Sequence, residues 1–118
     1  MGIIYKWTCN KTGKSYIGQT SNPIERKKQH IKNGSKVTNI NNKLYTAMRK
    51  YNDWTYTILE RNIPNNQLDK YECYYIGLYD SYKNGYNSTI GGSGQHYIRN
   101  YKNKIYTENI TLRNNIND

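Results

Sequence analysis

The sequence predicts a small α/β (α+β) domain with a three-stranded, mostly antiparallel sheet flanked by helices, in the order β-β-α-α-β-α. Three observations predict this class: β-branched and aromatic runs joined by a glycine-containing turn, apolar side chains at helical spacing, and strong helix start and stop signals. With 118 residues, the chain can form one domain with a small core, or one domain with an extra arm.

The strands are expected as an N-terminal hairpin and one later strand. Residues 2–9 carry β-branched and aromatic side chains, Gly13 is available for the positive φ of a turn, and residues 14–18 form the return strand. Residues 54–60 alternate in polarity and are expected as the third strand.

The first helix has clear boundaries. Asn22 is a good N-cap, Pro23 suits the first helical position, and Glu25 can reach back toward the cap. The helix should end near residue 33, because Gly34 follows.

Two further helices are expected. Between about residues 39 and 51, apolar side chains recur at helical spacing and form one stripe: Ile40, Leu44, Ala47, Met48 and Tyr51. The third helix should run from about Gln67 to Tyr82, after Pro64 and before Asn84-Gly85.

The chain changes character after Asn87. Residues 90–94 (IGGSG) are typical of a flexible link, so the predicted domain covers residues 1–94 and residues 95–118 form a polar, basic C-terminal arm or tail. An arm that docks on the domain, an extension that contacts a partner and a disordered end are all consistent with this composition.

The net charge of +10 favours a polyanionic partner, although simple solubility is the alternative. Residues 1–62 carry 12 Lys/Arg against 3 Asp/Glu, whereas residues 63–94 carry 2 against 3. This is the pattern of a phosphate-binding face with one embedded carboxylate site.

Composition also bears on origin and location. The chain has 14 Tyr, no Phe and 18 Asn, which indicates an AT-rich genome such as that of a phage, a virus or a low-GC bacterium. No apolar run approaches the length of a membrane span and no signal peptide is recognisable, so we expect a cytoplasmic protein that is neither secreted nor bound to a membrane.

Arg26 and His30 lie four positions apart on the first predicted helix and should share a face. Arg can bind phosphate oxygens through two hydrogen bonds, and His can transfer or position a proton near neutral pH. The alternative is a solvated basic face.

Glu72 falls within an apolar stripe of the third predicted helix, between Leu68 and Ile76. A carboxylate there is costly unless something pairs with it. The two interpretations are a buried cationic partner, such as an Arg, and a hard divalent cation, which prefers carboxylate and water oxygens.

Tyr5 and Tyr16 lie in the two strands of the predicted hairpin. Core packing is the default for either. A phenol could act as a base only if nearby cations favoured its ionised form, and the basic helix supplies such cations.

Taken in order, these residues resemble the GIY-YIG nuclease family, closest to its homing-endonuclease-like branch. Ile3-Ile4-Tyr5 and Tyr16-Ile17-Gly18 occupy the positions of the two tyrosine motifs, and Arg26, His30 and Glu72 follow at suitable spacings. Gly85-Tyr86-Asn87 closes the region, so the resemblance spans roughly residues 2–94.

The resemblance implies a divalent-metal-dependent DNA endonuclease that uses one Mg²⁺ or Mn²⁺ ion and leaves 5′-phosphate and 3′-hydroxyl ends. It makes Glu72 the metal ligand, Tyr5 or Tyr16 the general base with Tyr5 favoured, and Asn87 a supporting polar residue. Arg26 would grip the phosphate, and His30 would assist the base or the phosphate. The side chains expected to contact nucleic acid are Lys14, Arg26, Lys27 and Lys28.

Three positions depart from the family pattern. Ile3 stands where the first motif has Gly, with Gly2 displaced by one. Asn39 lies near the place of a second His in some homing enzymes, and Gln19 lies where repair nucleases have Lys. The departures put a second histidine role in doubt and argue against the repair branch.

A non-catalytic basic DNA- or RNA-binding module is the alternative function, because tyrosines interleaved with lysines can also stack on bases. Homing, restriction and repair roles stay open, as do the target sequence and a dimeric state.

Overall fold

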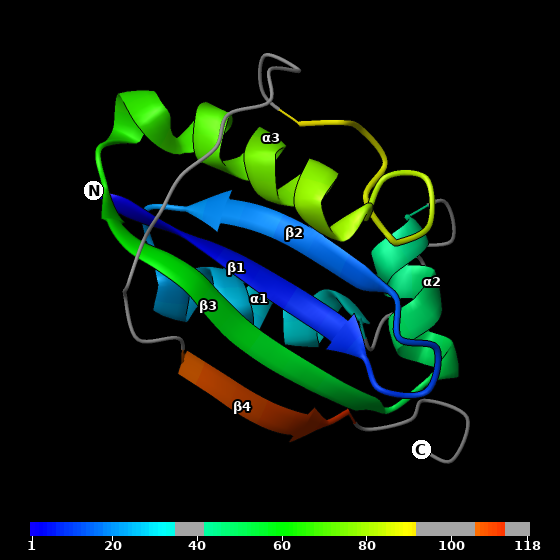
Figure 1. Ribbon diagram of the computed structural model, residues 1–118. Helices are drawn as coiled ribbons and strands as arrows, with labels where there is room; N and C mark the ends of the chain where they lie inside the picture. Colours follow the sequence, from blue (N-terminus) through cyan, green and yellow to red (C-terminus); the bar gives the residue numbers. More distant parts are fainter. Residues whose placement is uncertain (35–41, 92–105, 113–118) are drawn as a thin grey trace.

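The computed structural model describes residues 1–34, 42–91 and 106–112 (Figure 1). Its strands are β1 (Gly2–Cys9), β2 (Ser15–Thr20), β3 (Asp53–Ile63) and β4 (Tyr106–Thr111). They form one sheet in the order β2-β1-β3-β4, in which every neighbouring pair is antiparallel. The helices are α1 (Pro23–Gly34), α2 (Lys43–Lys50) and α3 (Leu68–Tyr79), with a 3₁₀ turn η1 (Asn65–Gln67) before α3.

The predicted fold class and element order are confirmed, but the predicted number of strands is wrong by one. β4 lies in the region expected to be an arm and pairs with β3 from Asp53↔Thr111 to Ile58↔Tyr106. Its sequence is polar, so the strand owes its place to the β3 edge rather than to its own apolar pattern. The arm therefore docks on the sheet over these residues; the domain boundary at residue 94 stays a prediction.

The start of α2 and the end of α3 differ from the predicted boundaries, and the capping residues explain both differences. α2 begins after Asn42, whose side-chain oxygen accepts a hydrogen bond from the Tyr45 backbone N–H at 3.0 Å. Ile40 and Asn39 lie outside the described residues. α3 ends at Tyr79 rather than near Tyr82, because Asp80 takes a left-handed conformation with φ of 51°.

Two apolar clusters lie on opposite faces of the sheet. Alternation along β1 places Tyr5, Trp7 and Cys9 on the face covered by α2 and by Ile31 of α1. On the other face Ile4 packs with α3, which runs along β2 (Figure 1). β2 is an edge strand, so side chains from both layers can meet beside it. No helix in the described ranges combines the length and apolarity needed to cross a membrane.

Candidate active site

Tyr5 lies in the core beneath α1, with a side chain 1% exposed. Its partner across the β1–β2 ladder is Gly18. The Tyr5 ring lies so close over Gly18 that a Cβ added there would come within 2.4 Å of the phenol oxygen. Gly18, the glycine of Tyr16-Ile17-Gly18, is therefore required sterically: it makes room for the ring of Tyr5.

His30 of α1 is also 1% exposed, and both of its ring nitrogens contact tyrosine hydroxyls. Its Nε2 lies 2.6 Å from the Tyr5 hydroxyl and its Nδ1 lies 2.9 Å from the Tyr45 hydroxyl. Burial, and then the charge of Arg26, lower the pKa of His30 to about 3. The ring is thus neutral at pH 7, so one nitrogen donates to a tyrosine while the other accepts.

Tyr16 stands at the outer side of this group. Its side chain is half-buried. Its ring centroid lies 5.6 Å from that of His30 and 6.3 Å from that of Tyr5. Burial raises the pKa of Tyr16, the nearby Arg26 charge lowers it, and the Glu72 carboxylate raises it. These effects show that Arg26 and Glu72 both lie within electrostatic reach of the Tyr16 phenol.

Arg26, one turn before His30 on α1, is half-buried. The pKa of Tyr5 shows that Arg26 acts on this phenol. Burial raises the pKa well above its usual value and Tyr16 raises it further, whereas the charge and hydrogen bond of Arg26 lower it. The expectation that Arg26 and His30 occupy one side of α1 thus agrees with the structure. The solvated-face alternative does not hold for His30, which is buried.

Glu72 is half-buried on α3 and approaches Tyr16 from the opposite layer, beside the β2 edge. The segment after α3 returns to it: a Cβ at Gly91 would lie 3.3 Å from Glu72 Oε1. Gly91 has φ of +83°, which a side chain would also disfavour. The backbone there can approach the carboxylate closely only because residue 91 is a glycine.

Asn87 joins this segment to β2. Its side-chain Nδ2 donates to the Ile17 carbonyl oxygen at 2.8 Å, and its Oδ1 accepts from the Ile17 backbone N–H at 2.8 Å. Tyr86 adds a backbone bond to the Ser15 carbonyl at 2.8 Å. Asn87 therefore completes the edge of the strand that carries Tyr16, and does so from a buried position.

The lysines expected to contact nucleic acid do not lie together. Lys28 is exposed on α1, and Lys14 is exposed at the start of β2. Lys27 forms an ion pair with Glu108 of β4, and its ammonium lies 4.9 Å from the centroid of the Tyr56 ring. This places Lys27 on the β4 side of α1.

Two polar core residues are not predicted from the sequence. Tyr45 lies outside the predicted apolar stripe of α2, and its hydroxyl holds His30. Glu60 of β3 is 1% exposed and accepts a hydrogen bond from the Tyr75 hydroxyl at 2.8 Å. Within the described ranges Glu60, rather than Glu72, is the fully buried carboxylate. The available signal was an acid inside the alternating run of β3.

The candidate site offers one carboxylate, that of Glu72, whose oxygens suit a hard divalent ion. No group of three or more His, Cys, Asp or Glu side chains with metal-binding geometry occurs among the described residues. Mg²⁺, however, is commonly held by one or two carboxylates together with water and substrate phosphate oxygens. Glu72 is half-exposed beside phenol groups, which gives one such carboxylate at an accessible edge.

Comparison with known proteins identifies the family of the chain. Residues 1–87 match the sequence model of the GIY-YIG catalytic domain. The chain therefore belongs to the GIY-YIG nuclease family, and the resemblance recognised in its motifs is confirmed.

A solved structure has a similar fold: a variant of the catalytic domain of the intron endonuclease I-TevI. The TM-score is 0.63 at 24% sequence identity, over 76% of this chain and 96% of that chain. No curated protein matches this sequence.

Proposed function

We propose that the protein is a DNA endonuclease that depends on one Mg²⁺ or Mn²⁺ ion and hydrolyses phosphodiester bonds, by nicking or double-strand cleavage, to 5′-phosphate and 3′-hydroxyl ends. The observation that supports this most directly is the 2.6 Å contact between the Tyr5 hydroxyl and His30 Nε2, beside Arg26, in a chain of this family. A buried, hydrogen-bonded phenol–imidazole pair next to a guanidinium is suited to proton transfer at a phosphate.

In this proposal Tyr5 accepts the proton of the attacking water. The water oxygen bonds to phosphorus as the bond from phosphorus to the 3′-oxygen breaks, and the leaving 3′-oxygen takes its proton from solvent water. Burial raises the pKa of Tyr5, so a free phenolate is costly. The cost is avoided if the phenol oxygen receives the water proton while its own proton passes to His30 Nε2. The neutral ring has a free nitrogen lone pair for that proton. Burial, and then the Arg26 charge, lower the pKa of His30, and a phosphate beside Arg26 offsets the second of these causes.

The remaining side chains bind and orient. Arg26 holds the phosphate oxygens, and Tyr16, at the outer side of the group, positions the water. Glu72 would hold the metal ion, which when bound stabilises negative charge on the phosphate. Asn87 keeps Tyr16 in place through Ile17. Lys14 and Lys28, which are exposed, add positive charge along the DNA backbone. Lys27 is paired with Glu108 and would have to leave that carboxylate to bind a phosphate.

The test uses supercoiled plasmid with Mg²⁺ or Mn²⁺, with and without EDTA. Glu72→Ala is expected to lose metal-dependent nicking by about 100-fold or more while DNA binding, measured by fluorescence anisotropy, stays measurable. Asp69→Ala removes an exposed carboxylate from the same helix and serves as the matched control, with both activities retained. Normal nicking by Glu72→Ala would show that the assignment of the metal ligand is wrong.

The same experiment separates the alternative function. A wild-type protein that binds DNA or RNA but cuts nothing under any metal condition is a non-catalytic binding module. A cytoplasmic location, a phage, viral or AT-rich bacterial origin, and a dimeric state stay predictions from the sequence.

A further inference from the structure

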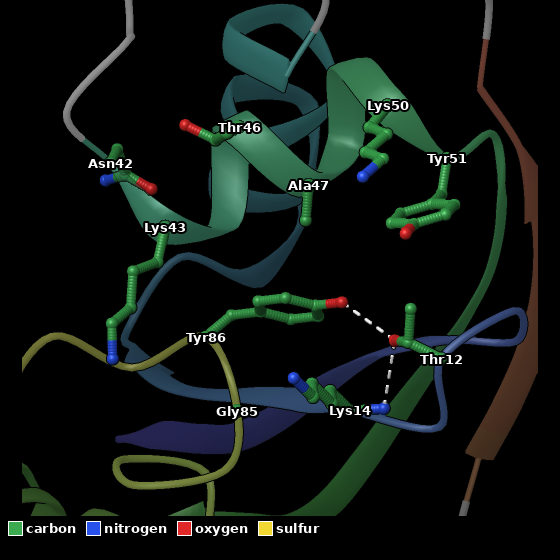
Figure 2. A pocket seen from close by; sticks show the side chains of 10 residues that line it. All are labelled: Thr12, Lys14, Asn42, Lys43, Thr46, Ala47, Lys50, Tyr51, Gly85 and Tyr86. Atoms are coloured by element: carbon green, nitrogen blue, oxygen red, sulfur yellow. Dashed lines mark hydrogen bonds between the residues drawn. The ribbon is translucent and has the colours of Figure 1, made fainter.

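A pocket lies outside the candidate active site, next to elements that carry Tyr16 and Tyr45. It has a volume of about 480 Å³ and lies between α2, the β1–β2 turn and the segment Gly85–Tyr86 (Figure 2). None of Tyr5, Tyr16, Arg26, His30 or Glu72 lines it. The volume lies within the roughly 300–1,000 Å³ that small-molecule and cofactor pockets occupy.

Positive charge gathers at this pocket. Its lining residues include Lys14, Lys43 and Lys50 and contain no Asp or Glu. Lys43 Nζ donates to the Asn87 carbonyl at 3.0 Å and to the Tyr82 carbonyl at 3.1 Å, so its ammonium is held against the neighbouring segment rather than in the pocket (Figure 2). Lys14 and Lys50 are exposed at the rim. Two ammonium groups at the rim, with no carboxylate in the lining, favour an anion.

Aromatic surface is combined with this charge. In Figure 2 the Tyr86 ring lies across the pocket below Ala47, with Tyr51 and Lys50 toward one end. The Tyr86 hydroxyl bonds Thr12 Oγ1 at 2.8 Å. The Tyr86 ring also packs on Trp54 with centroids 5.7 Å apart. Its orientation is therefore fixed before any ligand arrives, which lowers the entropic cost of stacking on it.

Ala47 gives the pocket its depth. It is the single alanine of the chain, it is buried, and it faces the Tyr86 ring from α2 (Figure 2). Most side chains at this point of the helix would occupy the space above the ring. An anionic group and a flat ring can therefore be accommodated together, and a nucleotide has both.

The walls of the pocket are the elements that hold the catalytic group. Lys14 comes two positions before Tyr16, Tyr86 precedes Asn87, and α2 also carries Tyr45. Two residues of an extended strand span roughly 7 Å, which is about two base steps of one DNA strand at 3.4 Å each. A nucleotide in the pocket could thus belong to the strand whose phosphate lies at Tyr16.

We propose that this pocket binds one unpaired nucleotide of the substrate strand close to the scissile phosphate, with its base on Tyr86 and Tyr51 and its phosphate at Lys14 and Lys50. The inference rests on the proposed nuclease function, since it places this nucleotide by the site of cutting. A base must leave its stack to enter, so the protein prefers DNA that is unpaired or easily unpaired at that position.

The test measures binding in EDTA, without cleavage. Two fluorescent duplexes of the same sequence are compared, one fully paired and one with a single bulged nucleotide. Wild type is expected to bind the bulged duplex about tenfold more tightly, the gain that one stacked base supplies. In Lys14→Ala/Lys50→Ala and in Tyr51→Leu this ratio should fall to about 2 or less, because phosphate and base contacts are lost.

The matched control is Lys11→Ala/Lys70→Ala, which removes the same charge from exposed positions outside the pocket. It should weaken binding to both duplexes and keep the ratio. The lysine variants change exposed side chains only, so the test stands even if Tyr51→Leu fails to fold. A wild-type ratio of 1, or a ratio unchanged in the lysine pocket variant, overturns the proposal.

Two further outcomes separate this proposal from its neighbours. If a deoxynucleoside 5′-monophosphate alone competes at the pocket as strongly as the bulged duplex, the pocket is a binding site for free nucleotide. The substrate-strand proposal is then wrong. If the ratio is as expected but no condition gives cleavage, the pocket binds an unpaired nucleotide and the proposed nuclease function is wrong. If cleavage occurs with a ratio of 1, the nuclease function is supported and the pocket proposal is wrong.

Discussion

The Tyr5 hydroxyl lies 2.6 Å from Nε2 of His30, and both side chains are 1% exposed. The bond joins β1 to α1 across the core. Because the other ring nitrogen contacts the Tyr45 hydroxyl at 2.9 Å, a proton shift at Tyr5 can be passed along a continuous path. The same three side chains also tie α1 and α2 to the sheet, so stability and chemistry are coupled here.

Tyr5→Phe removes the oxygen at the centre of this arrangement. We expect a loss of cleavage of about 100-fold or more, the usual size of general acid–base effects. The free energy of unfolding should fall by about 1–3 kcal/mol, because a ring nitrogen of His30 loses its buried partner. Single-turnover nicking and urea unfolding measure the two effects. Tyr82→Phe, at an exposed tyrosine, is the control and should leave both unchanged.

Tyr45→Phe is expected to act only through His30. The tautomer and orientation of the ring depend on the bond at Nδ1, so cleavage should fall by about tenfold, less than for Tyr5→Phe. The ¹⁵N chemical shifts of His30 should change in the same variant. Unchanged shifts together with slower cleavage would place Tyr45 outside this path.

The depressed pKa of His30 makes stability depend on pH. Burial and Arg26 lower it from 6.5 to about 3, so the unfolded chain binds a proton that the folded chain does not between these values. The contribution of neutral His30 is complete above pH 6.5 and is lost as pH falls toward 3. The slope from this one group is at most about 1.4 kcal/mol per pH unit.

His30→Gln provides the comparison, because glutamine does not titrate. Urea unfolding of wild type and variant at pH 7.5, 5.5 and 4.5 should show a difference that shrinks as the solution becomes more acidic. NMR should find the His30 ring neutral from pH 8 to pH 5. A His30 that titrates near its ordinary pKa of 6.5 contradicts the burial argument.

Gly18→Ala tests the contact with the Tyr5 ring. A Cβ there meets ring atoms at 2.4 Å, and the ring cannot move freely because His30 holds it. We expect a loss of about 1–3 kcal/mol in the free energy of unfolding, typical of overpacking, and a clear loss of cleavage. Gly13→Ala is the contrast: it meets no atom within 4 Å but has φ of +75°. It should cost about 1 kcal/mol and leave cleavage at the wild-type rate.

Local signals predicted most of the fold. Gly13 supports the hairpin, and Asn22-Pro23 marks the start of α1 within one residue. β4 could not be predicted in this way, because its pairing with β3 joins residues about fifty positions apart in a polar segment. Strand pairing of this kind depends on the neighbouring edge and leaves little trace in the sequence of the strand itself.

The candidate site, like the fold, is predicted from the sequence only in part. The spacing of Tyr5, Tyr16, Arg26 and His30 predicted a common site, and the structure brings the four together. Tyr45 was not foreseen, because helical spacing gives the direction of a side chain but not the partner of its hydroxyl. Likewise the sequence predicts a buried carboxylate on α3, whereas the carboxylate that is 1% exposed is that of Glu60, on a strand with both faces covered.

Asn87→Ala should show how much the β2 edge matters. The variant loses both bonds to Ile17 and leaves a buried N–H and C=O without their partner, so the free energy of unfolding should fall by about 2–4 kcal/mol. Tyr16 is adjacent to Ile17, so cleavage should also fall. Ser88→Ala, at the next residue and exposed, should stay within about 0.5 kcal/mol of wild type. Equal behaviour of the two variants would remove Asn87 from the supporting role.

Truncation after residue 94 tests the predicted domain boundary. The shortened chain lacks β4, which pairs with six residues of β3. It also lacks Leu112, which is 4% exposed and belongs to the same core cluster as Trp54. We expect a large loss of stability, of the order of 3 kcal/mol or more, since burying one leucine alone contributes about 1.5–3 kcal/mol. The uncovered β3 edge should also promote association, visible by light scattering.

Glu108→Gln distinguishes the contribution of the Lys27–Glu108 ion pair from that of strand β4 as a whole. It removes only the charge that faces Lys27, a partly exposed contact worth about 1 kcal/mol or less. If the truncated chain unfolds far more readily than Glu108→Gln, the stabilisation comes from the backbone pairing and apolar burial of residues 106–112, and the folding unit includes them. If it is as stable as the full chain and still cuts DNA, residues 1–94 are the autonomous domain that the composition predicted.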